Sequence, residues 1–405
     1  MAGDGGGGGA MTTTTTTVQD VREQAAQRFA QLGWPTPQQE EWKYTNVAPI
    51  ARVAWKLGSD AAPVPADFRF FERAAAEYVF VNGRALSAQR APFDNEHYAR
   101  YADYMRHPFT ALNTANAQDG ARIEIPDGTV VEGFIHLLFI GDGDGIWSHP
   151  RNLIVVGRNA QVTVVETYVG RGAYFTNAVT ELVALEGAVV DHTKVECESL
   201  QAFHVGTLQI HQGRSSSVTS RCFAIGGALA RNEINVALAG EGASITLDGL
   251  FTLTGNQHAD NHTVIDHLYP HCDSLELYKG ILDQSARGIF DGRIIVRPDA
   301  QKTSSRQTNH NLLLSETAIV DSKPTLEIHN DDVKCNHGST IGQLDEEAMF
   351  YLRSRGIGET EARELLIYAF ASEIVDRIKV EAVREQVRRQ MFRRMPERLP
   401  ERRER

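Results

Sequence analysis

The stretch that decides the fold is VVGRNAQVTVV, residues 155–165, in which an apolar run, a small polar turn and an alternating apolar run follow one another. The pattern recurs in VALEGAVVDHTKV (183–195), QIHQGRSSSVTS (209–220), ALAGEGASITL (237–247) and EIHNDDVKC (327–335). Each copy is typical of two short strands joined by a turn, because β-branched residues favour strands and Gly, Asn and Asp favour turns. The recurrence indicates a repeating architecture.

The spacing of the turns predicts which architecture this is. Gly157, Gly187, Gly213 and Gly242 mark turns that lie 26 to 30 residues apart, which is the interval of solenoid coils. A single coil cannot bury its own apolar face, but stacked coils form a continuous core. We therefore expect residues 119–341 to form a mainly β core, either a β-helix or a related β-solenoid. A flat β-sandwich is the alternative that the strands leave open.

Helical spacing predicts a helical region on each side of this core. Residues 18–118 are expected to be mainly helical, with a first helix indicated by Val21, Ala25, Phe29 and Leu32. Residues 342–395 are expected to form a C-terminal helical region. One face of its longer helix is expected to carry Leu365, Leu366, Ala369, Phe370, Ile374, Val375 and Ile378.

The two ends of the chain differ in composition from the rest. Residues 1–17 contain a Gly run followed by a Thr run, which cannot bury apolar surface, so we expect a disordered tail. Residues 396–405 are rich in Arg and Glu. Interleaved acidic residues argue against a nucleic-acid-binding arm, so we expect a charged tail.

Composition argues against several classes of protein. The chain has 405 residues, of which 42% are hydrophobic, and no stretch approaches the roughly 20 apolar residues of a membrane span. The net charge of −11 argues against nucleic acid as a partner. The four cysteines, Cys197, Cys222, Cys272 and Cys335, are widely spaced. Such spacing is typical of a reducing compartment and predicts a cytoplasmic protein.

Two candidate metal ligands lie near the end of the expected core. Side chains alternate along a strand, so Cys335 and His337 in VKCNH are expected to project from one face, about 7 Å apart. Thiolate and imidazole both bind iron or zinc. Two such ligands do not complete a tetrahedral shell, so other residues would have to supply the rest. The alternative is that Val333, Cys335 and His337 only pack against the core.

A second cluster of histidines lies in GNQHADNHTVIDHLYPHCD, residues 255–273. Its spacing matches neither an H-E-x-x-H helix nor a Cys/His zinc finger, so we expect a hydrogen-bonded surface. The residues concerned are His258, His262, His267, His271 and Cys272.

Other chemistry has little support in the sequence. No pair of acidic residues has the spacing of a general acid and base. A polysaccharide-active β-helix enzyme therefore remains an alternative by fold analogy alone. The chain also lacks GxxxxGK[ST], so no ATP site is expected.

Four segments resemble the SufB/SufD family of iron–sulfur cluster assembly scaffold proteins. They are DDVKCNHGSTIGQLDEEAMFYLRSRGI (331–357), EEWKYTN (40–46), HCDSLELYKGILDQSARGIFDGRIIV (271–296) and QTNHNLLLSETAIVDSKPTLEI (307–328). The similarity spans roughly residues 20 to 380. It implies a right-handed parallel β-helix between two helical regions, in agreement with the repeats.

Within that family the chain resembles the SufD branch rather than the SufB branch. SufB carries an essential cysteine on a core strand, and the matching stretch here, QTNHNLLL (307–314), has His310 near that position. SufB also has an acidic segment in place of KCNHG (334–338). In the SufD branch the histidine of this motif is implicated in cluster assembly at the SufB–SufD interface. The resemblance implies that role for His337, with Cys335 as its neighbour.

The resemblance also implies partners and a cargo. A scaffold subunit that is not itself an enzyme would pair with SufB, share iron or a nascent iron–sulfur cluster with it, and help to acquire iron. The SufC ATPase would bind the C-terminal helices and ATP. The expected partner interface comprises Val333, Cys335, His337, Met349, Phe350, Leu352, Leu365 and Leu366. Edge strands would also permit a homodimer when SufB is absent.

Overall fold

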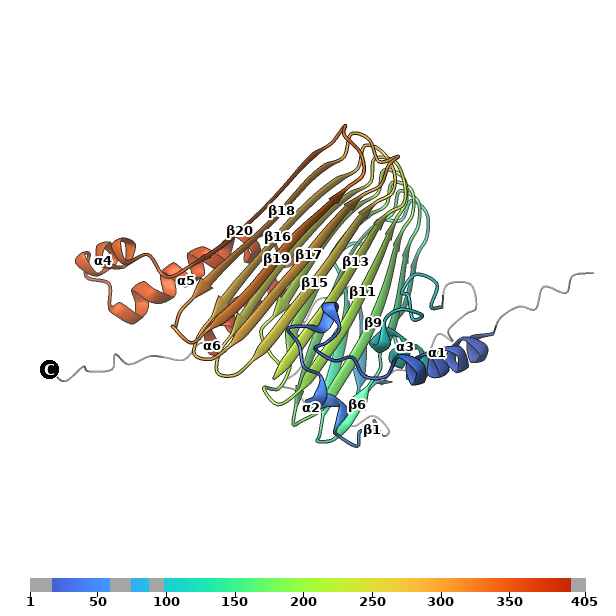
Figure 1. The fold of residues 1–405 in the computed structure, drawn as a ribbon, viewed down its shortest axis with the longest axis horizontal. Helices are drawn as coiled ribbons and strands as arrows, with labels where there is room; N and C mark the ends of the chain where they lie inside the picture. Colours follow the sequence, from blue (N-terminus) through green and yellow to red (C-terminus); the bar gives the residue numbers. More distant parts are fainter. Residues whose placement is uncertain (1–16, 59–73, 87–97, 395–405) are drawn as a thin grey trace, which may run out of the picture.

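The computed structural model describes residues 17–58, 74–86 and 98–394. Within these ranges two ten-stranded sheets form a β-solenoid (Figure 1). The first sheet contains β1 (Lys56–Leu57), β4 (Arg122–Ile125), β6 (Ile146–Ser148), β7 (Arg151–Val156), β9 (Phe175–Ala184), β11 (Phe203–Gln212), β13 (Leu229–Leu238), β15 (His258–His267), β17 (Arg287–Val296) and β19 (Ile319–Ile328). The second contains β2 (Ala76–Val81), β3 (Arg84–Ala85), β5 (Ile135–Asp142), β8 (Gln161–Arg171), β10 (Val189–Cys197), β12 (Ser217–Ala224), β14 (Ser244–Leu253), β16 (Asp273–Leu282), β18 (Ser304–Leu313) and β20 (Lys334–Gly342).

Successive coils are stacked in parallel register. Phe203 on β11 pairs with Leu229 on β13, and Arg287 on β17 pairs with Ile319 on β19, so successive coils are offset by 26 to 32 residues. About eight coils lie between residues 122 and 342. The predicted β-helix is confirmed, and the flat β-sandwich is wrong. The expected tails, apart from Thr17, lie outside the described residues.

The turns at one edge of the solenoid form a column of left-handed residues. In each turn one residue has a φ between 52° and 71°: Asn159, Gly187, Ser215, Gly242, His271 and Lys302. Their backbone N–H groups donate to the turn of the next coil, as Gly187 does to Arg214 O at 2.9 Å. Gly and Asn adopt this conformation at low cost. The column explains why small polar residues recur at the turns in the sequence.

The apolar core fills the space between the two sheets. It includes Ile154 and Leu182 from the first sheet and Val164 and Ile245 from the second, all at most 2% exposed. Because each coil contributes only part of this core, its apolar face is buried only when its neighbours are present.

The N-terminal region packs against the outer face of the first sheet. Its helices are α1 (Val18–Leu32), the 3₁₀ helix η1 (Glu40–Trp42), α2 (Ala48–Ala51) and α3 (Pro108–Asn116). Thr17 and Asp20 form a capping box at the start of α1. Trp42 and Phe109 pack in one cluster with Phe175 of β9. The region also contributes strands, since β2 pairs with β5 and extends the second sheet.

The C-terminal helices differ in whether they pack against the solenoid. Helices α5 (Glu359–Val375) and α6 (Glu381–Arg394) cover the outer face of the second sheet, whereas α4 (Glu346–Ser354) extends away from it (Figure 1). No helix among the described residues is both long enough and apolar enough to cross a membrane.

The buried side of α5 differs from the face that the sequence predicted. Ile374 and Val375 are buried as expected, but Leu365 is 46% exposed and Ala369 is exposed. Ala362, Ile367 and Ala371 are buried instead. The prediction of this face was partly wrong because apolar residues surround α5, so their spacing alone does not define the side that meets the sheet.

Candidate functional site

The last strand of the second sheet, β20, carries Cys335 and His337 at the open end of the solenoid. It pairs with β18, and no other described strand pairs with its second edge. Cys335 lies opposite Ser305, and His337 lies opposite Gln307. Ser305 and Gln307 are buried, whereas His337 is exposed, because no further coil of this chain covers it. The two candidate ligands therefore share one side of a terminal strand.

Cys335 is a less available ligand than His337. It is half-buried and packs, together with Val333, against the apolar core. Burial raises the pKa of its thiol, so the metal-binding thiolate is disfavoured at neutral pH. An imidazole binds metal in its neutral form. His337 is therefore the stronger candidate in the free chain.

The ligand set is incomplete in the described part of the chain. There, no group of three or more His, Cys, Asp or Glu side chains is arranged to hold a metal ion. A tetrahedral ion needs four ligands, and Cys335 and His337 supply at most two. Any metal held at β20 would need further ligands from elsewhere.

His310 faces away from this pair of residues. It lies on β18, where its register neighbours are Lys279 and Thr340, and its Nδ1 lies 2.6 Å from Thr340 Oγ1. The Lys279 Nζ lies 2.6 Å from a carboxylate oxygen of Glu373 on α5. His310 therefore belongs to the outer face that the C-terminal helices cover, and the structure does not bring it together with His337.

Helix α4 and the start of α5 present an exposed apolar surface. No residue of α4 is buried. Phe350 is 75% exposed and Tyr351 is 57% exposed, and Leu365 is exposed as well. Three further predicted interface residues are only partly buried: Met349, Leu352 and Leu366. Sequence reasoning missed Tyr351, although its position beside Phe350 on a short helix was a usable signal.

Two histidines of the second cluster anchor the N-terminal region to the first sheet. His258 and His262 lie on the outer face of β15. The His258 Nε2 lies 2.8 Å from Thr45 Oγ1, and the Thr45 hydroxyl donates to Asp260 Oδ2 at 2.5 Å. The His262 Nε2 lies 2.9 Å from Asp260 Oδ1. These contacts hold the EEWKYTN segment (40–46) against the solenoid.

The other members of that cluster lie elsewhere. His267 points into the solenoid, where its Nε2 lies 2.9 Å from Ser274 Oγ. His271 is the left-handed residue of a turn, and the buried Cys272 donates its thiol proton to Gly240 O. The five residues are therefore distributed over two faces and a turn.

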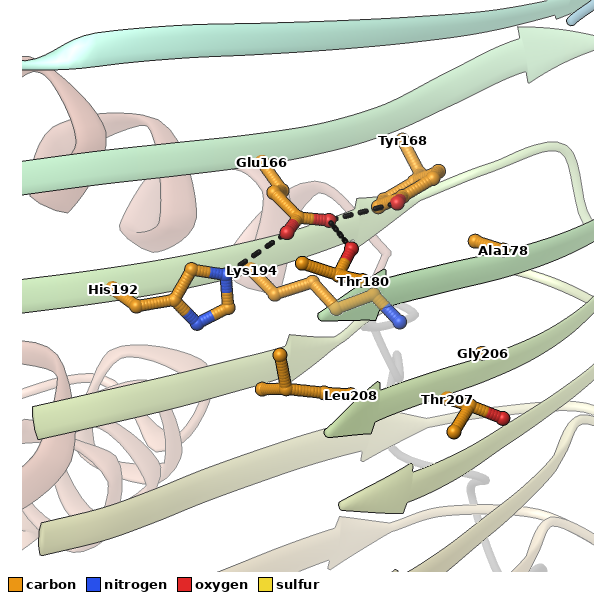
Figure 2. Close-up of a pocket in the computed structure, with 9 residues that line it drawn as sticks. All are labelled: Glu166, Tyr168, Ala178, Thr180, His192, Lys194, Gly206, Thr207 and Leu208. Atoms are coloured by element: carbon orange, nitrogen blue, oxygen red, sulfur yellow. Dashed lines mark hydrogen bonds and ion pairs between the residues drawn. The ribbon is translucent and has the colours of Figure 1, made fainter. Parts of the chain in front are cut away.

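A polar cluster that the sequence did not reveal lies inside the solenoid (Figure 2). Glu166 accepts hydrogen bonds from the Tyr168 hydroxyl at 2.8 Å and the Thr180 hydroxyl at 3.2 Å. The His192 Nε2 lies 3.2 Å from the other oxygen of Glu166. These side chains and Lys194 line a cavity of about 10 Å³, which has room for about one water molecule.

Lys194 connects this cluster to further buried carboxylates. Its Nζ lies 2.6 Å from Glu196, and His204 bridges Glu196 and Glu198 at 3.0 and 2.8 Å. Burial opposes the charge of Glu196, but His204 and Lys194 hold its pKa below the usual value. Burial also opposes the charge of Lys194, and Glu196 outweighs this and raises its pKa. The cluster thus satisfies its charges internally, as a structural network does.

A groove of about 260 Å³ lies on the outer face of the first sheet beside α3, with Asp103 and Asp266 in its lining. Both carboxylates are in ion pairs: Asp103 with Arg106 at 3.7 Å and Asp266 with Arg297 at 2.8 Å. A glycosidase needs two carboxyl groups free to act as acid and base. This groove gives no support to the polysaccharide-active alternative.

Comparison with known proteins agrees with the fold. A family model described as the SufBD core domain of SUF system FeS cluster assembly matches residues 139–370. The model of the SufBD protein N-terminal region matches residues 10–71 and 72–137.

Three relatives cover most of the chain. An iron–sulfur cluster assembly SufBD family protein of Synechocystis sp. is 34% identical over 399 residues, which cover 90% of this chain and 88% of the relative. The iron–sulfur cluster assembly protein SufD of Escherichia coli is 30% identical over 380 residues, 90% of each chain. The chloroplastic protein ABCI7 of Arabidopsis thaliana is 27% identical over 406 residues, 91% of this chain and 84% of the relative. This chain therefore belongs to the SufBD family of iron–sulfur cluster assembly proteins, a family of non-catalytic scaffolds.

Proposed function

We propose that this chain is the SufD-type subunit of a complex with SufB and SufC, and that it shares with SufB the site where clusters are assembled. The observation that carries the proposal is the exposed imidazole of His337 on a terminal strand, one edge of which pairs with no described strand. His337 gives one nitrogen ligand to iron or to the nascent cluster. SufB supplies the ligands that are missing from the described part of this chain.

The end of the solenoid supports a pairing with SufB. Strands β19 and β20 are the last strands of the two sheets, and each has an edge that no described strand covers. Unpaired strand edges readily pair with another chain. Ile319 and Ile341 are each 54% exposed there, and burying the exposed half of such a side chain stabilises an interface by about 1 kcal/mol. A second solenoid stacked on this end would cover both edges. A homodimer would use the same surface when SufB is absent.

The role of Cys335 follows from its surroundings. Its raised thiol pKa keeps it protonated until a metal displaces the proton. Cys335 is therefore a second ligand that binds only once iron is held at His337, or it acts as a packing residue beneath the site. Its substitution by Ser separates these roles, because Ser keeps the size and removes the sulfur ligand.

The exposed surface of α4 supports a contact with SufC. Phe350 lies on α4, which extends away from the solenoid, and Leu365 lies on α5, which covers the second sheet. Both side chains are exposed. Exposed aromatic residues of this kind are typical anchors of protein interfaces. SufC brings the nucleotide site, and ATP-driven movement of SufC is transmitted through these helices to the SufB interface. The four cysteines are free, in keeping with a cytoplasmic complex.

The test is anaerobic copurification of the three subunits followed by an absorption spectrum of the bound cluster. His337→Ala should leave the complex assembled and reduce cluster formation at least about tenfold. His329→Ala is the matched control, because His329 is another exposed histidine next to the last coil. Normal cluster formation by His337→Ala would refute the ligand role. Loss of the complex with both variants would show an effect on assembly instead.

A further inference from the structure

Three polar side chains form one column across the last three strands of the second sheet. Glu276 on β16 pairs in register with Gln307 on β18, and Gln307 pairs in register with His337 on β20. Glu276 and Gln307 are 0% exposed. His337 ends the column and is exposed. One amide side chain, that of Gln307, therefore lies in register between a buried acid and the exposed imidazole.

The first two members are joined by a hydrogen bond inside the solenoid. The Gln307 Nε2 donates to Glu276 Oε2 at 2.7 Å. Gly292 of the opposite sheet makes room for this amide, because a Cβ at that position would lie 2.4 Å from Gln307 Nε2. The amide is thus held closely in the space between the sheets.

The hydrogen bond decides which way the amide of Gln307 points. An ionised carboxylate only accepts hydrogen bonds, so it takes the NH₂ group of the amide. The amide oxygen Oε1 then points away from Glu276. This oxygen is buried and has no hydrogen-bond partner among the described residues. The next side chain in the column is His337, and adjacent strands lie about 4.8 Å apart.

We infer that Gln307 and Glu276 are positioning residues for His337. The Gln307 oxygen accepts the N–H of one ring nitrogen, so that the other nitrogen carries its lone pair toward the shared cluster. Glu276 fixes the amide in the orientation that makes this possible. The inference rests on the proposed ligand role of His337. Metal-binding histidines generally donate their second ring N–H to an oxygen acceptor, which sets the tautomer and the ring orientation.

The environment of Glu276 makes the arrangement sensitive to pH. Burial raises its pKa to about 7, and the hydrogen bond from Gln307 and the nearby Thr263 hydroxyl oppose this only in part. Its neighbours in register are Leu247 and Gln307. Thr263 faces it from the opposite sheet, and Tyr278 lies two residues along its own strand. None of these four carries a charge at neutral pH, so no ion pair holds the carboxylate ionised.

Protonation of Glu276 would remove the constraint on the amide. A protonated carboxyl group has an O–H that donates to an amide oxygen, so Gln307 can then turn its oxygen toward β16. His337 loses its acceptor in that state. His337 is therefore held in one tautomer when the pH is above the pKa of Glu276, and it can adopt either tautomer when the pH is below that value.

The first test measures the imidazole itself and needs no cluster. NMR of ¹⁵N-histidine in the full chain at pH 8 should show one dominant tautomer for His337, and Gln307→Leu should give a mixture of both. Gln212→Leu is the matched control, because Gln212 is also 0% exposed but lies on β11, far along the solenoid. An unchanged tautomer in folded Gln307→Leu would overturn the inference, whatever His337→Ala does to cluster formation.

A second test uses the pH dependence and separates positioning from stability. With SufB and SufC present, the ratio of the cluster-formation rates of the wild type and Glu276→Gln should rise from about one at pH 6 to roughly tenfold at pH 8, the scale of outer-shell effects. A neutral amide at position 276 cannot fix the orientation of Gln307 at any pH. A ratio that does not change with pH would contradict the role of Glu276.

Discussion

The guanidinium of Arg231 lies 3.8 Å from the ring centroid of Trp42, so the buried arginine of β13 is covered by a side chain from the N-terminal region. Arg231 also forms ion pairs with Glu233 at 2.9 Å and with Asp260. Asp260 in turn accepts the hydrogen bond of Thr45. The EEWKYTN segment thus closes a buried charge network on the outer face of the first sheet.

Removal of the Trp42 ring should release this segment. Trp42→Ala removes both the apolar contact and the cover over Arg231, so we expect the free energy of unfolding to fall by about 3–5 kcal/mol. Hydrogen exchange should show loss of protection in residues 42–51 before any loss in β13. Lys43→Ala is the control, because Lys43 is exposed in the same segment. Equal protection in the wild type and Trp42→Ala would contradict the described packing.

The polar cluster inside the solenoid makes a prediction about stability alone. Lys194→Met leaves Glu196 and Glu166 without their buried cation, and breaking a buried pair costs about 3–5 kcal/mol. Chemical denaturation should show this loss. Arg214→Met, which removes a surface pair with Glu186, should have little effect. If both variants had the same stability, the cluster would not be the internally balanced network described above.

The raised pKa of Glu276 predicts how stability changes with pH. Its value is about 7 in the folded chain against an ordinary 4.5, so the unfolded chain loses this proton first as the pH rises. The contribution of Glu276 therefore destabilises the fold increasingly from pH 4.5 to 7, by on the order of 3 kcal/mol in total. Glu276→Gln should remove this dependence and unfold at a higher denaturant concentration than the wild type at pH 8. If Glu276→Gln were less stable than the wild type at pH 8, the description of Glu276 as a buried carboxylate without an ion pair would be wrong.

The surface of α4 makes a prediction about binding. Phe350→Ala should weaken the recovery of SufC at least about tenfold, since truncation of an exposed aromatic anchor removes most of an interface contact. Ala favours helices, so α4 itself should be retained. Tyr269→Ala is a suitable control, because Tyr269 is an exposed aromatic residue in a turn of the solenoid. Undiminished SufC binding by Phe350→Ala would place the contact elsewhere.

The solenoid was predictable because its signal is local and repeated. Turns such as that at Gly187 need a left-handed residue once per coil. Small or polar residues that tolerate this conformation therefore recur along the sequence at the length of one coil. The alternation of side chains along a strand made Cys335 and His337 predictable as neighbours on one face. Neither inference required knowledge of contacts between distant residues.

Other features depend on which side of a strand or helix faces the core, and the sequence leaves that ambiguous. Glu166, Glu276 and Gln307 are inside the solenoid, but polar residues in an alternating strand resemble an exposed face. In α5, apolar residues on several sides hid the fact that Ile367 rather than Leu365 meets the sheet. His258 and His267 lie on opposite faces of β15 because they are an odd number of residues apart on one unbroken strand, and the sequence did not show that a single strand spans both residues.

The most direct test of the central claim is pulsed EPR on the anaerobically assembled complex, with ¹⁵N-histidine in this chain only. A reduced, paramagnetic cluster bound by His337 should show ¹⁵N hyperfine coupling in the wild type and in His329→Ala. The coupling should disappear in His337→Ala. A cluster that forms without any ¹⁵N coupling from this chain, or whose coupling persists in His337→Ala, would contradict the account.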